Sequence, residues 1–347
     1  MLLEVKNAIL TQNSGTYLIR RFAFSVIALL FLLTFVFILS RAVPGDPAMF
    51  AAGLEATAEQ IEKVREEYGL NKDYFTQYVM FLKGLSKGNL GRSMYTRRPV
   101  AEDLIEKLPA SLELTIAAMI FGIIIGVPLA VVAGTKPRSF LDHGSRVLGL
   151  IGLSLPVFWY GIILQIIFYG FLGWFSASGR LPIGTIIPNY TGFILVDSLL
   201  AGDLKLLGKA LNHLILPAFA LSQVIIALIV RMLRSNLLDV MGEDYIMTAR
   251  AKGLSEKVVI FKHAIKNAIL PVLTLLGVQI GLIMSGAVLT EAIFSWPGIG
   301  SYAYRASMNL DYPVILGVTL MIGGIFLLVN LLVDIIHGLL DPRLRYD

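Results

Sequence analysis

Few residues of this 347-residue chain have the types and spacings that perform chemistry. Its four histidines are scattered, without a His-Glu-x-x-His pattern or any cluster with metal-ligand spacing. The chain has no cysteine and no Gly-x-x-x-x-Gly-Lys-Ser/Thr phosphate loop, so it offers neither a thiol nucleophile nor a site for ATP hydrolysis. The sequence therefore predicts a protein that is not an enzyme, binds no cofactor or metal, and has no catalytic residues.

The most informative polar segment is 243–255, between two long apolar segments. Asp244 is a residue type that caps helix starts, and residues 249–252 favour helix. Gly253 suits the left-handed residue that ends a helix, after which Ser255 can cap another. We therefore predict a short exposed docking helix, 244–252, and a second helix, 255–268; an inert amphipathic linker is the alternative. The second helix should have one apolar face, made by Val258, Phe261, Ile265, Ala268 and Ile269.

The elements that must carry this segment are membrane helices. Apolar residues make up 56% of the chain and charged residues 15%, whereas soluble domains have roughly 45–50% and about 25%. A bilayer core of about 30 Å takes roughly 20 apolar residues of helix. Six segments meet this requirement: 22–40, 114–133, 147–175, 214–230, 270–289 and 314–333. We predict an all-α polytopic membrane protein with six transmembrane helices and a small extracytoplasmic insertion after the first. The third span is over-long, which indicates a tilt or an interfacial end.

The first span follows Arg20 and Arg21, as in a signal peptide, but its length and the lack of a small-x-small cleavage site favour a retained anchor. Lys and Arg of the short loops gather before this span, in 134–146, in 231–266 and at the C-terminus. Because such residues stay cytoplasmic, we expect a multi-pass cell-membrane protein with both termini in the cytoplasm. Anionic lipid explains the net charge of +5, so no nucleic-acid partner is expected.

Ionisable groups near mid-membrane are almost absent from these spans, which argues against coupling to protons or sodium. Neutral polar residues occur there instead. They could line a path for a hydrated substrate or only hydrogen-bond between helices, and both interpretations stay open. The candidates for a translocation path are Gln165, Ser222, Gln223, Gln279 and Ser285.

Segment 291–300 follows the fifth span and cannot continue as a straight helix, because of its proline and glycines. It could be a bent, partly re-entrant outer gate with its tryptophan at the membrane interface, or a plain interfacial turn. The gate residues would be Glu291, Phe294, Trp296, Pro297 and Gly298.

Several separated motifs carry a family resemblance. They are Arg20 and Arg21, then PGDPA at 44–48, GNLGRS at 88–93, LPASLEL at 108–114, EAIFSWPGIG at 291–300 and LDPRLR at 340–345. With segment 243–255, they resemble inner-membrane permeases of ABC importers of the dipeptide/oligopeptide/nickel group, in particular the B-type subunit. Asn89 stands where an aspartate is common, and Met247 where the general importer pattern has an acid.

The resemblance implies an N-terminal anchor and extracytoplasmic cap at 1–110, a permease core at 111–338 with a coupling loop at 239–269, and a cytoplasmic tail at 339–347. It also implies a prokaryotic inner-membrane location and half of a translocation pathway for peptides. The implied partners are a second homologous permease, an external substrate-binding protein, and two ATPase subunits that bind ATP and Mg. The coupling residues would be Asp244, Tyr245, Thr248, Ala249, Arg250, Ala251, Lys252 and Gly253.

Other functions remain open at this point. Nickel or oligosaccharides are alternative substrates within the same group. An ion-coupled secondary transporter and a structural membrane subunit are alternatives of other classes.

Overall fold

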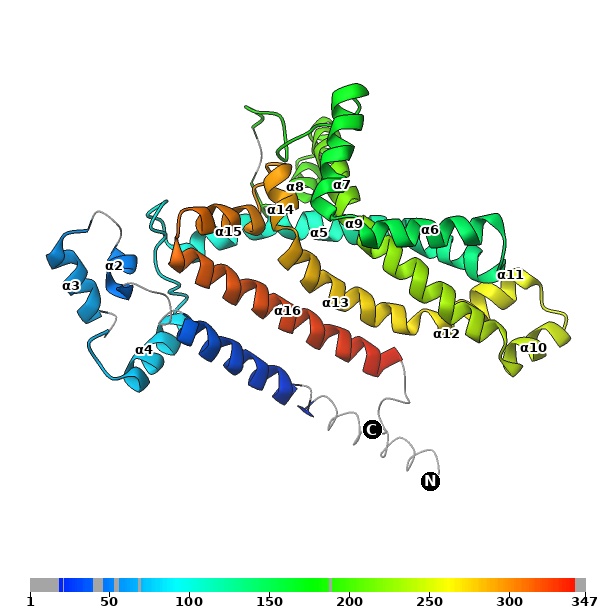
Figure 1. The fold of residues 1–347 in the computed structure, drawn as a ribbon, viewed down its shortest axis with the longest axis horizontal. Coiled ribbons are helices and arrows are strands. Elements are labelled where there is room, and N and C mark those ends of the chain that lie inside the picture. The colour runs from blue at the N-terminus through cyan, green and yellow to red at the C-terminus, as the bar shows by residue number, and fades with distance from the viewer. Residues whose placement is uncertain are drawn as a thin grey trace. The chain divides into compact units, whose positions relative to one another are not determined.

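The computed structural model describes residues 19–20, 22–39, 46–52, 56–67, 70–186 and 189–340. These residues form helices and loops, and none of them lies in a β-strand (Figure 1). The predicted all-α polytopic fold is thereby confirmed. The chain divides into one compact unit of Met1–Ser111 with Pro297–Asp347 and a second unit of Leu112–Trp296. The predicted boundaries at residues 110 and 338 stay predictions.

By length and composition, the described residues offer up to six membrane spans, if each of two bent helix pairs counts as one. Within the described residues, four unbroken helices are long and apolar enough: Phe22–Leu39, α5 (Val100–Thr135), α9 (Leu204–Met241) and Tyr312–Val333 of α16 (Tyr312–Leu340). The bent pairs are α6 (Phe140–Ser154) with α7 (Val157–Leu164) and the π-helical η1 (Gln165–Phe171), and Glu256–Ala268 with α13 (Leu270–Gly286).

The third predicted span, 147–175, is wrong as a single helix. α7 leaves α6 at an angle of 107°, visible as an upright helix beside a horizontal one in Figure 1. Pro156 explains the break, because the residue before a proline is disfavoured in helical conformation and Leu155 is extended, with φ −86° and ψ 130°. Nε2 of Gln223 on α9 donates a hydrogen bond to the Leu155 carbonyl over 3.0 Å, which holds the break against α9.

In the first unit, the N-terminal helix packs on the cap that follows it. The cap contains α2 (Pro47–Ala52), α3 (Ala58–Glu67) and α4 (Tyr74–Ser86). Thr34 hydrogen-bonds to the Tyr78 hydroxyl at 2.8 Å, and the Phe37 ring lies 5.2 Å from the Tyr78 ring, centroid to centroid. The side chain of Asp73 caps α4 by accepting from the Thr76 amide.

The start of α5 packs on α15 (Ile299–Met308) and α16 in the same unit, around Leu104, Ile299 and Val314. Polar contacts run through this core. The Tyr302 hydroxyl donates to Asp103 at 2.8 Å, and burial together with this bond raises the pKa of Tyr302. Asp311, just before α16, accepts from the Ser93 hydroxyl.

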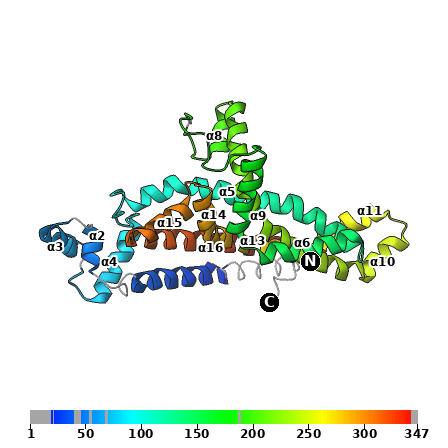
Figure 2. The same cartoon turned by 45° about the horizontal axis from the view of Figure 1, so that its top comes forward.

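In the second unit, α5 and α9 interlock through small residues. A Cβ atom on Gly122 would lie 2.4 Å from the Ile225 side chain, and one on Gly126 would lie 3.1 Å from Ile229. Such close approach allows two apolar helices to pack tightly in a bilayer. α8 (Ile194–Leu200), α7 and the first part of α9 lie side by side in both views (Figure 1, Figure 2). The predicted docking segment lies just beyond the other end of α9.

Candidate docking and gating sites

The predicted docking helix exists as α10 (Asp244–Ala251), one residue shorter than expected. Its N-cap is Glu243, so the expected capping role of Asp244 is wrong: Asp244 is the first helical residue. A carboxylate in the first turn still interacts favourably with the helix dipole. Gly253 has φ +77°, which confirms the predicted left-handed turn. Ser255 is the N-cap residue of α11 (Glu256–Val258), as expected, although its side chain makes no capping bond there.

α10 buries one side and exposes the other. Ile246 and Ala249, one turn apart, are buried against the following helices, while Met247 is 54% exposed. Tyr245 and Leu254 are also exposed. The other predicted coupling residues on this surface are likewise exposed: Asp244, Thr248, Arg250, Ala251, Lys252 and Gly253. Ala249 is the predicted coupling residue that instead lies inside. An exposed set of large apolar side chains with basic neighbours is suited to docking on another protein.

Polar contacts hold α10 to the helices that follow it, and one of these helices to α9. Asn267 on α12 (Ile265–Ala268) donates to the Tyr245 hydroxyl at 2.8 Å. Nδ2 of Asn236 on α9 donates to the Ala268 carbonyl at 3.0 Å. Across the Gly253 turn, Nε of Arg250 lies 2.7 Å from Glu256, and this pairing raises the pKa of Arg250. Displacement of α10 would therefore be passed to α9 and to α12.

The second predicted helix is only partly regular. Its middle is the π-helical η2 (Val259–Ala264), between α11 and α12. A π turn holds more residues than an α turn, so the apolar pattern read with helical spacing slips in register. Val259 and Ala264 are buried, whereas Phe261, which was predicted on the apolar face, is 68% exposed. Its place on that face stays a prediction. Beyond α12, α13 begins with Pro271 in its first turn after a bend of 52°.

The predicted gate segment, 291–300, contains the end of α14 (Val288–Ile293), a tight turn and the first residues of α15. We call residues 288–296 the gate turn. Glu291, Phe294 and Trp296 are each 1% exposed, so the expected interfacial position of Trp296 is wrong. Ser295 has φ +48°, and the Trp296 amide donates back to the Glu291 carbonyl at 2.7 Å. Pro297 is exposed and Gly298 is the N-cap residue of α15. The gate function of this turn stays a prediction.

A loop of the second unit, 172–193, fastens this turn. The Gly179 amide donates to the Phe294 carbonyl at 2.8 Å. The Arg180 guanidinium lies over the Trp296 ring at 5.7 Å and donates to Glu113 of α5 at 2.6 Å. His213 hydrogen-bonds to the Ser178 carbonyl at 2.9 Å, in keeping with an architectural role. In the described part of the chain, no group of three or more metal-ligating side chains is brought together.

Three predicted path residues make hydrogen bonds within the second unit. Gln165 donates to the carbonyls of Ala177 and Ile293, at 2.7 and 3.4 Å, and so joins η1 to the gate turn. Ser222 donates to Phe219 in its own helix, and Gln223 holds the break at Leu155. Gln279 is buried, and the side chain of Ser285 lies outside the described residues. These contacts fit interhelical bonding; the path assignment stays a prediction.

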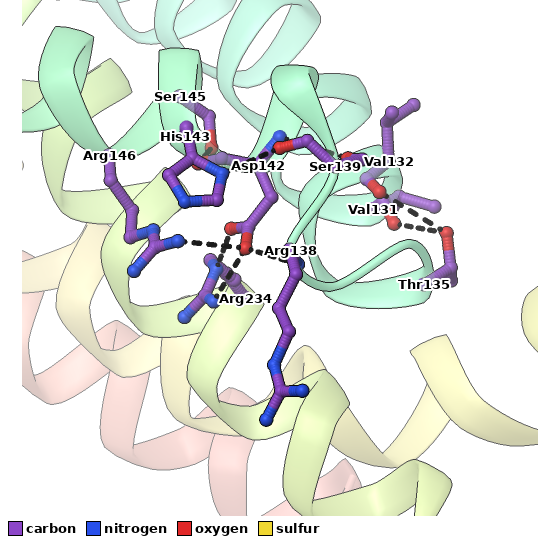
Figure 3. A network of polar contacts seen from close by, with 10 residues as sticks. All are labelled: Val131, Val132, Thr135, Arg138, Ser139, Asp142, His143, Ser145, Arg146 and Arg234. Atoms are coloured by element: carbon purple, nitrogen blue, oxygen red, sulfur yellow. Dashed lines mark hydrogen bonds and ion pairs between the residues drawn. The ribbon is translucent and has the colours of Figure 1, made fainter.

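Asp142, which the sequence analysis missed, is a buried carboxylate at the centre of an ionic network (Figure 3). Its side chain accepts from Nε of Arg234 at 2.5 Å, from Arg146 at 3.2 Å and from the Arg138 amide at 2.9 Å. Ser139 caps α6 and accepts from the Asp142 amide. The sequence did contain one signal for this network: Asp142 is a lone acid within the basic segment 134–146. In the sequence analysis, that segment served only to assign the side of the membrane.

Comparison with known proteins decides the family. Residues 126–346 match the family model "Binding-protein-dependent transport system inner membrane component", and residues 15–115 match the model of the N-terminal part of such components. The chain belongs to this family of permeases. It is a multi-pass membrane subunit of a transporter, which confirms the expected permease class and that the chain is not itself an enzyme.

Curated permeases align along nearly the whole chain. The dipeptide transport system permease DppB of Alkalihalophilus pseudofirmus is 42% identical, with 95% of this chain and 99% of that protein covered. The di/tripeptide permease DppB of Pseudomonas aeruginosa is 44% identical, with 91% and 94% covered. The oligopeptide permease AppB of Bacillus subtilis is 36% identical, with 96% and 100% covered.

Proposed function

We propose that this permease forms half of the translocation pathway of an ATP-driven importer for dipeptides and short oligopeptides. The observation that carries the substrate class is its similarity to peptide permeases along their full length, 42% to DppB of A. pseudofirmus. The resemblance of the chain to permeases of ABC importers supports import of the peptide rather than export. A second homologous permease completes the pathway, and an external binding protein delivers the peptide.

Energy enters from two separate ATPase subunits, because the chain contains no phosphate loop of its own. ATP and Mg belong to those subunits. α10 suits the contact with them: it is short, its outer side carries Met247 and Tyr245, and Asn267 fixes it to the helix before α13. The orientation that follows from the Lys and Arg distribution puts α10 and both termini in the cytoplasm of a prokaryotic cell.

Reconstitution of the complete transporter tests this function. The chain, its partner permease and the ATPase subunits are placed in liposomes that contain ATP, and the binding protein is added outside with a labelled dipeptide. We expect uptake of the dipeptide that stops without ATP or without this chain. Uptake that is unaffected by excess unlabelled dipeptide but blocked by nickel or an oligosaccharide would contradict the peptide assignment. Uptake by this chain alone would contradict the need for ATPase subunits.

A further inference from the structure

The Asp142 network connects α6 with α9. Asp142 lies in the first turn of α6 and is fully buried, at 0% exposure. Arg234, on α9, approaches it with two nitrogens, Nε to Oδ1 at 2.5 Å and a terminal nitrogen to Oδ2 at 3.1 Å. Arg146 belongs to α6 itself, four residues after Asp142, and reaches the same Oδ2. One carboxylate is thus shared by a cation of its own helix and a cation of the neighbouring helix (Figure 3).

The α9 end of this contact lies beside the coupling segment. Arg234 precedes the end of α9, at Met241, by about two helical turns. Asn236, two residues further on, holds the Ala268 carbonyl, and Asn267 next to it holds Tyr245 of α10. The last turns of α9 therefore contact α6 through Arg234 and the docking helix through α12.

The α6 end leads toward the gate turn. α6 ends at the break before Pro156, and α7 with η1 continues from there. Gln165, the first residue of η1, donates to the Ile293 carbonyl at the end of α14. A shift of α6 relative to α9 at Asp142 would therefore move α7 and η1, which contact the gate turn.

We propose that Asp142 is a positioning residue for transport, which releases Arg234 during the cycle while it stays paired with Arg146. In the structure described here its pair with Arg234 fixes α6 to α9. When α10 is displaced and α9 moves, that pair opens and Arg146 keeps the carboxylate paired. The physical reason is that a buried ion pair is costly to break when one charge is left without a partner. Arg146, half-exposed and on the same helix, moves with Asp142 and removes most of that cost. We call Asp142, Arg234 and Arg146 the Asp142 latch.

This proposal rests on the proposed importer function, and its test compares two glutamine variants in the complete reconstituted transporter. Arg234→Gln leaves the latch open, so we expect ATP hydrolysis to continue while dipeptide uptake falls, which raises the ATP used per dipeptide. Arg146→Gln makes opening more costly, so hydrolysis and uptake should fall together, several-fold, with their ratio unchanged. The matched control is Arg231→Gln, one turn before Arg234 on α9: it is exposed, and no hydrogen bond or ion pair is recorded for it among the described residues.

The two variants separate release of Arg234 from a static brace, because only Arg234→Gln should change the ATP used per dipeptide. If Arg146 only strengthened a fixed contact, its loss would raise the ATP used per dipeptide as the loss of Arg234 does, and that result would overturn the proposal. Equal behaviour of both variants and wild type would overturn it as well. Absence of ATP-dependent dipeptide uptake in the wild type would instead contradict the proposed function.

A distance measurement keeps the proposal testable if a variant assembles poorly. The chain has no native cysteine, so spin labels attach to it only at Phe140→Cys on α6 and Ser235→Cys on α9, both exposed, and the distance between these two labels is measured. In the otherwise unaltered transporter we expect a second distance to appear when ATP is bound without hydrolysis. Arg146→Gln should reduce that second population. One unchanged distance in every nucleotide state would overturn the latch.

Discussion

α10 and the gate turn, 288–296, are two short helical segments of one unit that the sequence marks as functional, yet they differ in surroundings. α10 presents most of its length to solvent and buries Ile246 and Ala249. The gate turn buries Phe294 and Trp296 almost completely. The difference teaches that the first can act by direct docking, whereas the second can act only through the helices and loop that enclose it. Substitutions should therefore affect stability at the gate turn and coupling at α10.

The largest effect on stability is expected from Phe294→Ala. Phe294 packs against Leu164, Leu216 and Ala220, so its truncation leaves a cavity that should cost about 3–5 kcal/mol. Met247→Ala, on the exposed side of α10, is the matched control and should leave stability unchanged. Thermal unfolding of the purified chain in detergent, without ATPase subunits, measures both. Equal losses of stability would remove the contrast between the two segments.

Arg180→Met tests the loop that fastens the gate turn. It leaves Glu113, which is 6% exposed at its side chain, without its cation, at a cost of about 3–5 kcal/mol. In the double variant Glu113→Gln with Arg180→Met, no charge is left unpaired, so stability should recover in part. The same unfolding measurement compares them. A double variant less stable than Arg180→Met would show that the ion pair does not govern this loop.

Gly253→Val tests the geometry of α10 without a steric clash, since no atom lies within 4 Å of the added Cβ. A left-handed conformation costs a side-chain-bearing residue roughly 1–2 kcal/mol, and asparagine tolerates it better than valine. We expect Gly253→Val to abolish dipeptide uptake while binding-protein capture of peptide continues, and Gly253→Asn to retain uptake. Similar uptake by the two variants would mean that this turn does not set the coupling geometry.

The smallest effect is expected from Tyr245→Phe, which removes the acceptor for Asn267 and keeps the ring. A single hydrogen bond contributes about 0.5–1.5 kcal/mol, so uptake per ATP should fall only modestly. Asn267→Ala should have the same effect, and the double variant should add nothing further. Additive losses would show that the two side chains act separately.

The sequence was sufficient where local chemistry decides the structure. Gly253 and Ser255 gave the turn after α10 because their conformational preferences act within a few residues. Leu155 and Pro156 carried an equally local signal for the break in the third span, but the long apolar run around them favoured one helix. By contrast, the π-helical register that exposes Phe261 leaves no pattern in residue types.

Long-range contacts could not be obtained in this way. Arg180 reaches Glu113 across 67 positions and Arg234 reaches Asp142 across 92. For each of these four residues, many other residues of the opposite charge along the chain could have been its partner. The burial of Trp296 depends likewise on a distant loop, whereas its residue type favours a membrane interface. Such pairings follow from the packing of the helices, which residue types and spacings in a single sequence do not reveal.

The central claim is that an ATPase subunit docks on the exposed side of α10. In this chain without native cysteine, a short bifunctional crosslinker is attached to Met247→Cys in the assembled transporter, with Met308→Cys on α15, 70% exposed, as the matched control. The account predicts a crosslink to the ATPase subunit from position 247 and none from position 308. A crosslink from position 308 with none from position 247, in a transporter that takes up dipeptide normally, would contradict it.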